Sequence, residues 1–294
     1  MLFSFRVFVV EAFRCKNKKF DSKNIDMARI IHETVEVLSN ISVGSGYYRI
    51  KLGCHRQYAK AIPGQFVMVR PKAQIDPLLP RPFSIHRLTK QDGVVTSLEL
   101  LFKVVGKGTH ALSQKKSGDH IDLTGPLGNG FSIPAGVQHI KIVAGGIGVA
   151  PMIFFLDYLK EHRHDLADIE VFLGGKSKAD LLCLNDFSAL GVPVHMTTDD
   201  GSSGDRCLVT DPLESAIAQN LPDIIYACGP MDMLACISGI ADKYRIACQV
   251  SIEAMMACGM GACLGCAVAR RNHSSSYLHA CLDGPVFDIQ ELLL

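Results

Sequence analysis

The 294-residue chain has no tryptophan, almost no net charge and no long uninterrupted apolar run. Its formal net charge is +1, from 30 Lys and Arg against 29 Asp and Glu, so neither nucleic acid nor an anionic membrane is expected as partner. The apolar stretch 1–13 is interrupted by Arg6 and Glu11 and is too short to span a bilayer. It also lacks a basic start and a small-residue cleavage site, so a secretory signal is not predicted.

Residues 1–26 differ in composition from the rest, with six Lys and Arg against three Asp and Glu. A clear strand pattern begins only after Met27. We therefore expect residues 1–27 to be a disordered N-terminal extension, or to follow an upstream start that the natural protein does not use.

Eleven cysteines are present, but an odd number without a secretory signal does not indicate a disulfide framework. A reducing, cytoplasmic setting with a thiolate-bound metal fits better. Cys258, Cys263, Cys266 and Cys281 have the spacing C-x4-C-x2-C-x14-C, which is the plant-type ligand pattern of a 2Fe–2S cluster. Each iron then takes two sulfurs. Zinc sites usually show two C-x2-C pairs and this segment has one, so structural zinc remains the weaker alternative.

The first half of the chain, residues 28–135, reads as short strands between turns, which predicts an antiparallel β-barrel. Alternating patterns mark strands at 35–38, 47–52, 65–69 and 98–105, and one short helix is expected near 109–115 with Thr109 as its N-cap. Residues 123–130 contain too many Gly and Pro for a regular element and are expected to form the exit from the barrel. Two motifs could bind phosphates, namely Arg81-Pro82-Phe83-Ser84 and the turn with Gly108 and Thr109.

The second half, residues 136–247, alternates strands and helices, which predicts a parallel sheet flanked by helices. A strand at 139–144 runs into a glycine turn with Gly145, Gly146 and Gly148, and a helix at 152–162 follows. This order is typical of a nucleotide pyrophosphate site. The last apolar strand ends at Cys228-Gly229-Pro230, where we expect Cys228 to line the nucleotide site rather than act as a nucleophile.

The order of these motifs, followed by the four-cysteine segment at 248–294, resembles the ferredoxin–NADP reductase superfamily. Within it the chain is most similar to the electron-transfer subunits of NAD-dependent dihydroorotate dehydrogenases. The resemblance implies an FAD-binding β-barrel, an α/β parallel-sheet domain that binds NAD, and a C-terminal 2Fe–2S cysteine-rich segment. It further implies FAD contacts at Arg81, Pro82, Phe83, Ser84, Leu101, Phe102, Lys103, Gly108 and Thr109, and NAD contacts at Gly145, Gly146, Gly148, Cys228, Gly229 and Pro230.

The resemblance also implies a partner, the FMN-containing catalytic subunit that oxidises dihydroorotate to orotate in pyrimidine biosynthesis. Two copies of each subunit would form a heterotetramer. Because the cofactors carry the chemistry, no general acid or base is predicted. Three alternatives remain open: a related subunit of a sulfide dehydrogenase, a related NADPH–ferredoxin oxidoreductase, and a nucleotide-sensing module with zinc. Lys176 and Lys178 could attract a 2′-phosphate, so NADP stays open as well.

Overall fold

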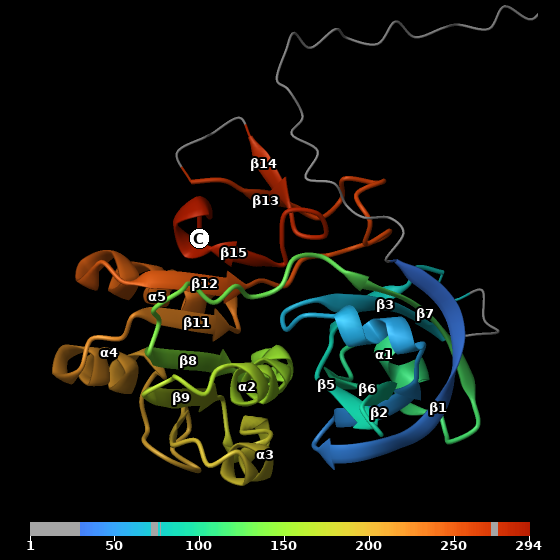
Figure 1. The fold of residues 1–294 in the computed structure, drawn as a ribbon, viewed down its shortest axis with the longest axis horizontal. Helices are drawn as coiled ribbons and strands as arrows, with labels where there is room; N and C mark the ends of the chain where they lie inside the picture. The colour runs from blue at the N-terminus through green and yellow to red at the C-terminus, as the bar shows by residue number, and fades with distance from the viewer. Residues whose placement is uncertain (1–29, 72–75, 77, 272–275) are drawn as a thin grey trace, which may run out of the picture.

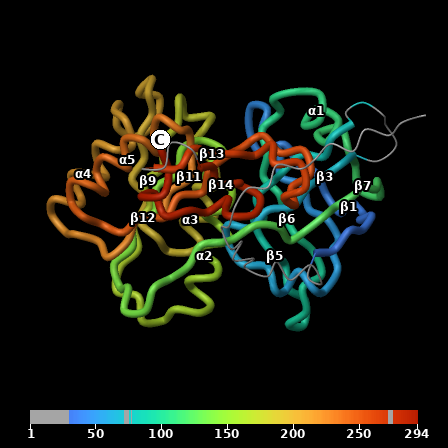
Figure 2. Tube along the Cα trace, turned by 90° about the horizontal axis from the view of Figure 1, so that it is seen from above, coloured from blue at the N-terminus to red at the C-terminus, as the bar shows by residue number. Residues whose placement is uncertain are grey.

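The computed structural model describes residues 30–71, 76, 78–271 and 276–294, and the predicted extension at 1–27 lies outside them. An antiparallel sheet and an α/β sheet lie side by side, with the C-terminal segment above both (Figure 1). Seen from above, this segment crosses the boundary between the two sheets (Figure 2). None of the helices in the described residues is long and apolar enough to cross a bilayer.

Seven antiparallel strands form the first sheet, in the order β4-β3-β7-β1-β2-β6-β5. Its end strands do not pair, but β4 contacts β6, so the sheet curls into a nearly closed barrel, as predicted. Alternating side chains fill its interior, among them Val35, Ile50, Leu98 and Leu100. The strands are β1 (Ile31–Gly44), β2 (Tyr47–Gly53), β3 (Phe66–Pro71), β4 (Arg81–Ser84), β5 (Arg87–Gln91), β6 (Val94–Lys103) and β7 (His120–Leu127).

Two local predictions in the barrel are wrong. Thr109 is not the N-cap of α1 (Lys107–Ser113); Gly106 is, and Thr109 occupies the third helical position. Its hydroxyl accepts the amides of Val105 at 2.9 Å and Gly106 at 3.1 Å, which closes the turn that precedes the helix. Residues 123–127, expected to be irregular, belong to β7. Gly125 and Pro126 form a β-bulge, because these two residues lie opposite one residue of β3, Val67.

The second sheet has the order β10-β9-β8-β11-β12-β15, and all its neighbours are parallel except β12 and β15. One apolar core takes side chains from α2 and α3, and a second, on the other face, takes them from α4 and α5. The bounds are β8 (His139–Gly145), α2 (Ala150–His162), β9 (Asp168–Gly175), α3 (Leu184–Ala189), β10 (Val194–Thr198), α4 (Thr210–Gln219), β11 (Ile224–Cys228) and α5 (Met231–Tyr244).

The C-terminal segment is continuous with this sheet. β12 (Ala247–Ser251) pairs with β11, and β15 (Val286–Asp288) returns antiparallel to β12. Between them lie the cysteines and a small two-stranded sheet, β13 (Ala267–Ala269) with β14 (Tyr277–His279). Four short 3-10 helices complete the described elements: η2 (Arg56–Lys60), η3 (Gly146–Val149), η4 (Lys178–Asp180) and η5 (Ile289–Glu291). The cysteine-bearing loop is therefore held at both ends by the nucleotide sheet.

Candidate functional site

One cavity lies where the barrel, the α/β sheet and the C-terminal segment meet. Almost every residue predicted to contact FAD lines it, as do Gly148 and Cys228 from the predicted nucleotide site. Antiparallel pairing explains part of this convergence, since Pro82 and Phe83 of β4 lie opposite Met68 and Val67 of β3. The predicted residues in the lining are Arg81, Pro82, Phe83, Ser84, Leu101, Phe102, Lys103, Thr109, Gly148 and Cys228.

Arg81 and the start of α1 form one corner of the cavity. A Cβ on Gly108 would lie 3.2 Å from Nε of Arg81, so the absence of a side chain lets the arginine lie against the helix start. The Arg81 guanidinium also donates to the carbonyl of Leu79 at 2.6 Å. A positive fork beside a helix start is well suited to a diphosphate.

The three residues of β6 that were predicted to contact FAD point their side chains into different surroundings. Phe102 packs in the barrel core, where its ring stacks on Tyr48 and meets Phe83 edge-on, each at 5.7 Å between centroids. Leu101 belongs instead to the core shared with α2. The Lys103 ammonium lies 3.5 Å from the carboxylate of Asp180 and 4.7 Å from the centre of the Tyr47 ring. Lys103 therefore already has a protein partner at the cavity wall.

The glycine turn after β8 packs directly on the end of β11. A Cβ on Gly148 would lie only 2.2 Å from the carbonyl oxygen of Cys228, and one on Gly145 would meet Pro230 at 2.8 Å. Gly146 has a positive φ of 52° and open space around it. Of the six predicted nucleotide contacts, Gly148 and Cys228 therefore line the cavity, while Gly145, Gly229 and Pro230 pack together behind it.

Burial makes Cys228 an unreactive thiol. Desolvation raises its pKa to about 12, and the nearby Glu253 carboxylate contributes in the same direction. Glu253 itself lines the cavity, where its side chain is open to the cavity space, and surrounding protein atoms raise its pKa by desolvation. A neutral thiol fits the prediction that Cys228 is not a nucleophile.

The four cysteines lie in two pairs. The amide of Cys263 donates to Sγ of Cys258 at 3.4 Å, and the sulfurs of Cys266 and Cys281 are 3.2 Å apart. Among the described residues, no group of three or more His, Cys, Asp or Glu is arranged to hold a metal ion. Two pairs of thiols fit a cluster of two irons, each of which takes two thiolates.

Backbone amides also favour a thiolate in this loop. Burial opposes ionisation of Cys258, but the amides of Met260 and Cys263 outweigh it and lower the pKa of this thiol to about 7. Cys281 is different: burial and the Cys266 sulfur raise its pKa to about 12. Amide donors around sulfur are a usual feature of iron–sulfur sites.

The cysteine loop lies directly on the barrel. Gly259 has φ of 71°, and a Cβ there would meet Cγ of Met68 at 2.5 Å. Met68 is paired with Pro82, so the loop touches the strand next to the Arg81–Ser84 motif. The side chain of Asn129 also holds the C-terminal segment, because it donates to the carbonyls of Leu282 and Asp283, both at 2.9 Å.

Sequence reasoning missed several residues of the cavity wall. Ser251, Ile252, Glu253, Ala254 and Met256 line it, and they come from the stretch that joins β12 to the cysteines. No ligand pattern marks these residues. The signal that could have found them is topological, since any chain leaving the carboxyl end of β12 starts at the ligand-binding edge of the sheet.

Comparison with protein families matches the three parts of the chain to three models. Residues 33–131 match an oxidoreductase FAD-binding domain and residues 142–239 an oxidoreductase NAD-binding domain. Residues 253–293 match the iron–sulfur cluster binding domain of dihydroorotate dehydrogenase B. The cofactors of the chain are therefore FAD, NAD and an iron–sulfur cluster, rather than zinc.

Curated relatives agree over most of the chain. The dihydroorotate dehydrogenase B (NAD(+)) electron transfer subunit of Desulforamulus reducens is 41% identical over 77% of this chain and 85% of its own. That of Caldanaerobacter subterraneus subsp. tengcongensis is 39% identical over 87% of this chain and 96% of its own. The chain belongs to this family. It is an electron-transfer subunit of an oxidoreductase.

Solved structures agree on the fold. An NADH-dependent reduced ferredoxin–NADP oxidoreductase is 29% identical, with a TM-score of 0.76 over 88% of this chain and 89% of that one. The cytochrome b5 reductase domain of Ulva prolifera nitrate reductase, 18% identical with a TM-score of 0.60 over 74% of this chain and 94% of its own, shares the fold alone. The second match omits about a quarter of the chain, and the family models place the iron–sulfur part at the C-terminus.

Proposed function

We propose that this chain takes electrons from an FMN-containing dihydroorotate dehydrogenase catalytic subunit and delivers them to NAD+. The supporting observation is that the Arg81–Ser84 strand, the end of the Gly145–Gly148 turn and the start of the cysteine segment share one cavity. When bound, the cluster would carry single electrons, and the flavin would exchange them in pairs with nicotinamide.

The chain's own residues hold and separate these groups. Cys258, Cys263, Cys266 and Cys281 would ligate the cluster, and Arg81 with the Gly108–Thr109 turn would bind the FAD diphosphate. Cys228 would leave room for the nicotinamide at the opposite wall because its side chain is small, and Gly148 would let the glycine turn pack on the end of β11 beside it. Gly145, Gly146, Gly229 and Pro230 would shape the turn for the NAD diphosphate.

We assign the chain three regions on this basis: the FAD barrel at 28–135, the NAD domain at 136–247 and the cluster segment at 248–294. The barrel and the nucleotide sheet have separate strand networks, which supports the first boundary. β12 lies at the second boundary and pairs with the nucleotide sheet, so the cluster segment is anchored there rather than free.

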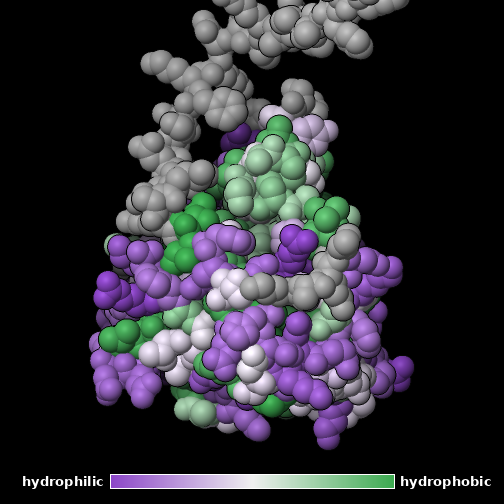
Figure 3. All heavy atoms as spheres, turned by 90° about the vertical axis from the view of Figure 1, so that its right-hand side faces the viewer, coloured by the Kyte–Doolittle hydropathy of each residue, from purple (hydrophilic) through white to green (hydrophobic). Residues whose placement is uncertain are grey.

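The partner would dock on the cluster segment. Several apolar side chains are exposed around the cysteines: Met255 is 91% exposed, Leu264 57% and Tyr277 63%. Figure 3 shows apolar side chains gathered at the top of the molecule, on the face that looks away from the nucleotide sheet. Exposed apolar side chains beside a redox centre suit a partner that must come close to it. Two copies of each subunit would complete a cytoplasmic heterotetramer.

Reconstitution tests this proposal. The chain is mixed with a purified dihydroorotate dehydrogenase catalytic subunit, dihydroorotate and NAD+, and NADH is followed by its absorbance. We expect NADH to form only when both subunits are present, together with flavin and iron–sulfur absorbance in the isolated chain. A colourless chain, or no NADH from a complex that contains all cofactors, would contradict the proposal.

A second candidate is a subunit that joins a nicotinamide nucleotide to ferredoxin. It is favoured by the 29% identity to the NADH-dependent reduced ferredoxin–NADP oxidoreductase. Reduced ferredoxin should then replace dihydroorotate and the catalytic subunit as electron source. Comparing rates with NADH and NADPH decides the nucleotide in either case.

A further inference from the structure

The carboxylate of Asp180, in η4, joins the loop after β9 to the barrel. Its Oδ1 accepts the Tyr47 hydroxyl of β2 at 2.6 Å and lies 3.5 Å from the Lys103 ammonium of β6. Its Oδ2 accepts the Ser177 amide at 3.2 Å, within the same loop. One side chain therefore closes the loop and joins it to two barrel strands.

The charges of these groups suit the link. Burial opposes ionisation of Asp180, but hydrogen bonds from Tyr47 and Ser177 and the nearby Lys103 charge hold its pKa below its usual range. Burial, and then Asp180, raise the pKa of Tyr47, which stays a protonated donor. Tyr47 as a whole residue is only 2% exposed, so water competes little for its hydroxyl.

The loop lies at the ligand edge of the nucleotide sheet. Strand order reverses between β8 and β11, and ligands of such sheets bind at the carboxyl ends of the strands beside that point. The β11 side, at Cys228, lines the FAD cavity. The β9 side continues from Gly174, which is paired with Gly145 of the glycine turn, directly into residues 176–180. If the nicotinamide of NAD points toward FAD on the β11 side, the adenosine half of NAD lies on the β9 side, at this loop.

The same loop also connects to the end of β10. The Lys178 amide donates to the Ser202 hydroxyl at 2.7 Å, and Ser202 in turn donates to Asp200 at 2.6 Å. The Asp200 amide donates back to the carbonyl of Lys176 at 3.2 Å. Residues 176–180 and 199–202 thus form one hydrogen-bonded surface, and among the contacts described here Asp180 is its ion-pair link to the barrel.

We propose that Asp180 is a positioning residue that, through Tyr47 and Lys103, holds the adenosine-binding edge of the NAD site in register with the FAD cavity. This inference rests on the proposed function. It assigns no chemical step to Asp180. Loss of the link should weaken binding of the adenosine half of NAD while leaving FAD and the cluster in place.

The boundary between the barrel and the nucleotide domain, here called the seam, has another ion pair that provides a matched control. Lys90 of β5 and Glu161 of α2 also pair across the boundary between barrel and nucleotide domain, but neither belongs to the β9 loop. The E161Q variant therefore removes a cross-domain ion pair without touching the proposed link. If any loosening of the seam disturbed NAD, this variant would do so too.

The test measures equilibrium binding of ADP-ribose, which lacks nicotinamide, to FAD-loaded wild type, Y47F, D180A, the double variant and E161Q. We expect Y47F to weaken ADP-ribose binding by about three- to tenfold, the size of one hydrogen bond. In the D180A background, Y47F should have no further effect, because the acceptor is already gone. The KM for NADH should rise in parallel, with kcat and FAD content unchanged in Y47F.

Three results would overturn the proposal: unchanged ADP-ribose binding in Y47F and D180A, independent effects of the two substitutions, or an equal loss in E161Q. Failure of the proposed function looks different. In that case the wild-type chain itself would not bind ADP-ribose or would not form NADH with its partner subunit.

Discussion

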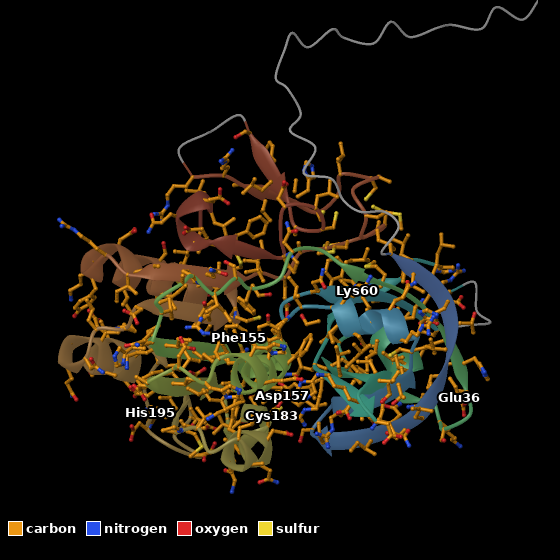
Figure 4. All side chains as sticks on the ribbon, in the orientation of Figure 1. Glu36, Lys60, Phe155, Asp157, Cys183 and His195 are labelled. Atoms are coloured by element: carbon orange, nitrogen blue, oxygen red, sulfur yellow. The ribbon has the colours of Figure 1, made fainter. Side chains whose placement is uncertain are left out.

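The barrel meets its two neighbours through different kinds of contact. Leu101 packs in the apolar core shared with α2, but the seam with the nucleotide domain also carries ion pairs: Arg87 of β5 donates to Asp157 of α2 and to Asp186 of α3, both at 2.8 Å. Figure 4 shows Asp157 and Cys183 toward this seam, whereas His195 lies at the outer edge of the sheet and Glu36 on the outside of the barrel. Against the cluster segment the contacts include a backbone approach at Gly259, which leaves no room for a Cβ beside Met68.

The two seams serve different needs. Side-chain ion pairs can break and re-form at modest cost, which suits a seam beside a nucleotide that must enter and leave. A backbone contact that leaves no room for a Cβ cannot shift without moving the chain. Such a contact suits a cluster that must stay at one distance from the flavin, because the protein's part in redox chemistry is to fix that geometry.

The largest effect is expected where the rigid seam holds the cluster. Cys266→Ser removes a buried sulfur that lies 3.2 Å from Cys281. We expect the iron–sulfur absorbance to disappear and electron transfer from the partner subunit to fall by about 100-fold or more. NADH oxidation by ferricyanide, which needs only FAD, should persist.

Cys236→Ser on α5 is the matched control, since Cys236 is an exposed cysteine outside the cluster segment. It should retain both activities and the full iron content. Loss of ferricyanide reduction in Cys266→Ser would mean that the rigid seam supports the FAD site itself, and the contrast between the seams would weaken.

The second prediction adds a Cβ at the close contact between Gly259 and Met68. Gly259→Ala combines a φ of 71° with a Cβ 2.5 Å from Met68. Gly46→Ala has a similar φ of 76° but nothing within 4 Å, so it measures the backbone strain alone. We expect about 1–2 kcal/mol of destabilisation for Gly46→Ala and a further 1–3 kcal/mol for Gly259→Ala, measured by urea unfolding. Equal losses would show that the approach to Met68 is not tight.

These glycines mark the limit of what the sequence could predict. Spacing alone predicted the cysteine ligands. Side-chain alternation predicted strands of the barrel, because periodicity reports which face of a strand is buried, and the alternation of strands with helices predicted the parallel sheet. In the sequence, Gly259 is marked only by its place directly after Cys258. Its contact with Met68 joins residues far apart in the chain, and no local pattern encodes it.

Local turn chemistry failed for a related reason. The Gly and Pro content of 123–127 predicted an irregular segment, but a bulge opposite Val67 kept it in the barrel. Thr109 was correctly placed near a helix start, yet its hydroxyl closes the turn from inside the helix. The Asp180 link was invisible in the sequence because Tyr47, Lys103 and Asp180 meet only when the two domains pack.

The third prediction tests whether the charged seam depends on pH. His86 is fully buried there, and its Nδ1 donates to the carbonyl of Ala150 at 2.8 Å, while its Nε2 has no hydrogen-bond partner among the described residues. Burial lowers its pKa from 6.5 to about 4. The folded state thus binds this proton less readily than the unfolded state, so stability is full above pH 6.5 and falls as the pH drops toward 4.

The expected loss from this residue is about 3 kcal/mol over that interval, since each pKa unit corresponds to about 1.4 kcal/mol. His86→Asn keeps a donor for Ala150 but does not titrate. Urea unfolding of both proteins from pH 8 to pH 4 should therefore show a smaller decline in the variant. Parallel curves would mean that His86 gains a proton without disturbing the seam.

The smallest effect is expected at the partly buried ion pairs of Arg87. Its side chain is 26% exposed and serves two carboxylates, of which Asp186 is 19% exposed. Arg87→Lys keeps the charge but cannot reach both, and we expect it to cost about 1–2 kcal/mol, less in high salt. Arg87→Met, which removes the charge and strands both carboxylates, should cost more. Unfolding in low and high salt separates the two variants. Because the contact between Gly259 and Met68 carries no charge, the same salt should leave the stability difference between Gly259→Ala and wild type unchanged. A salt-sensitive difference would erase the distinction between the two seams.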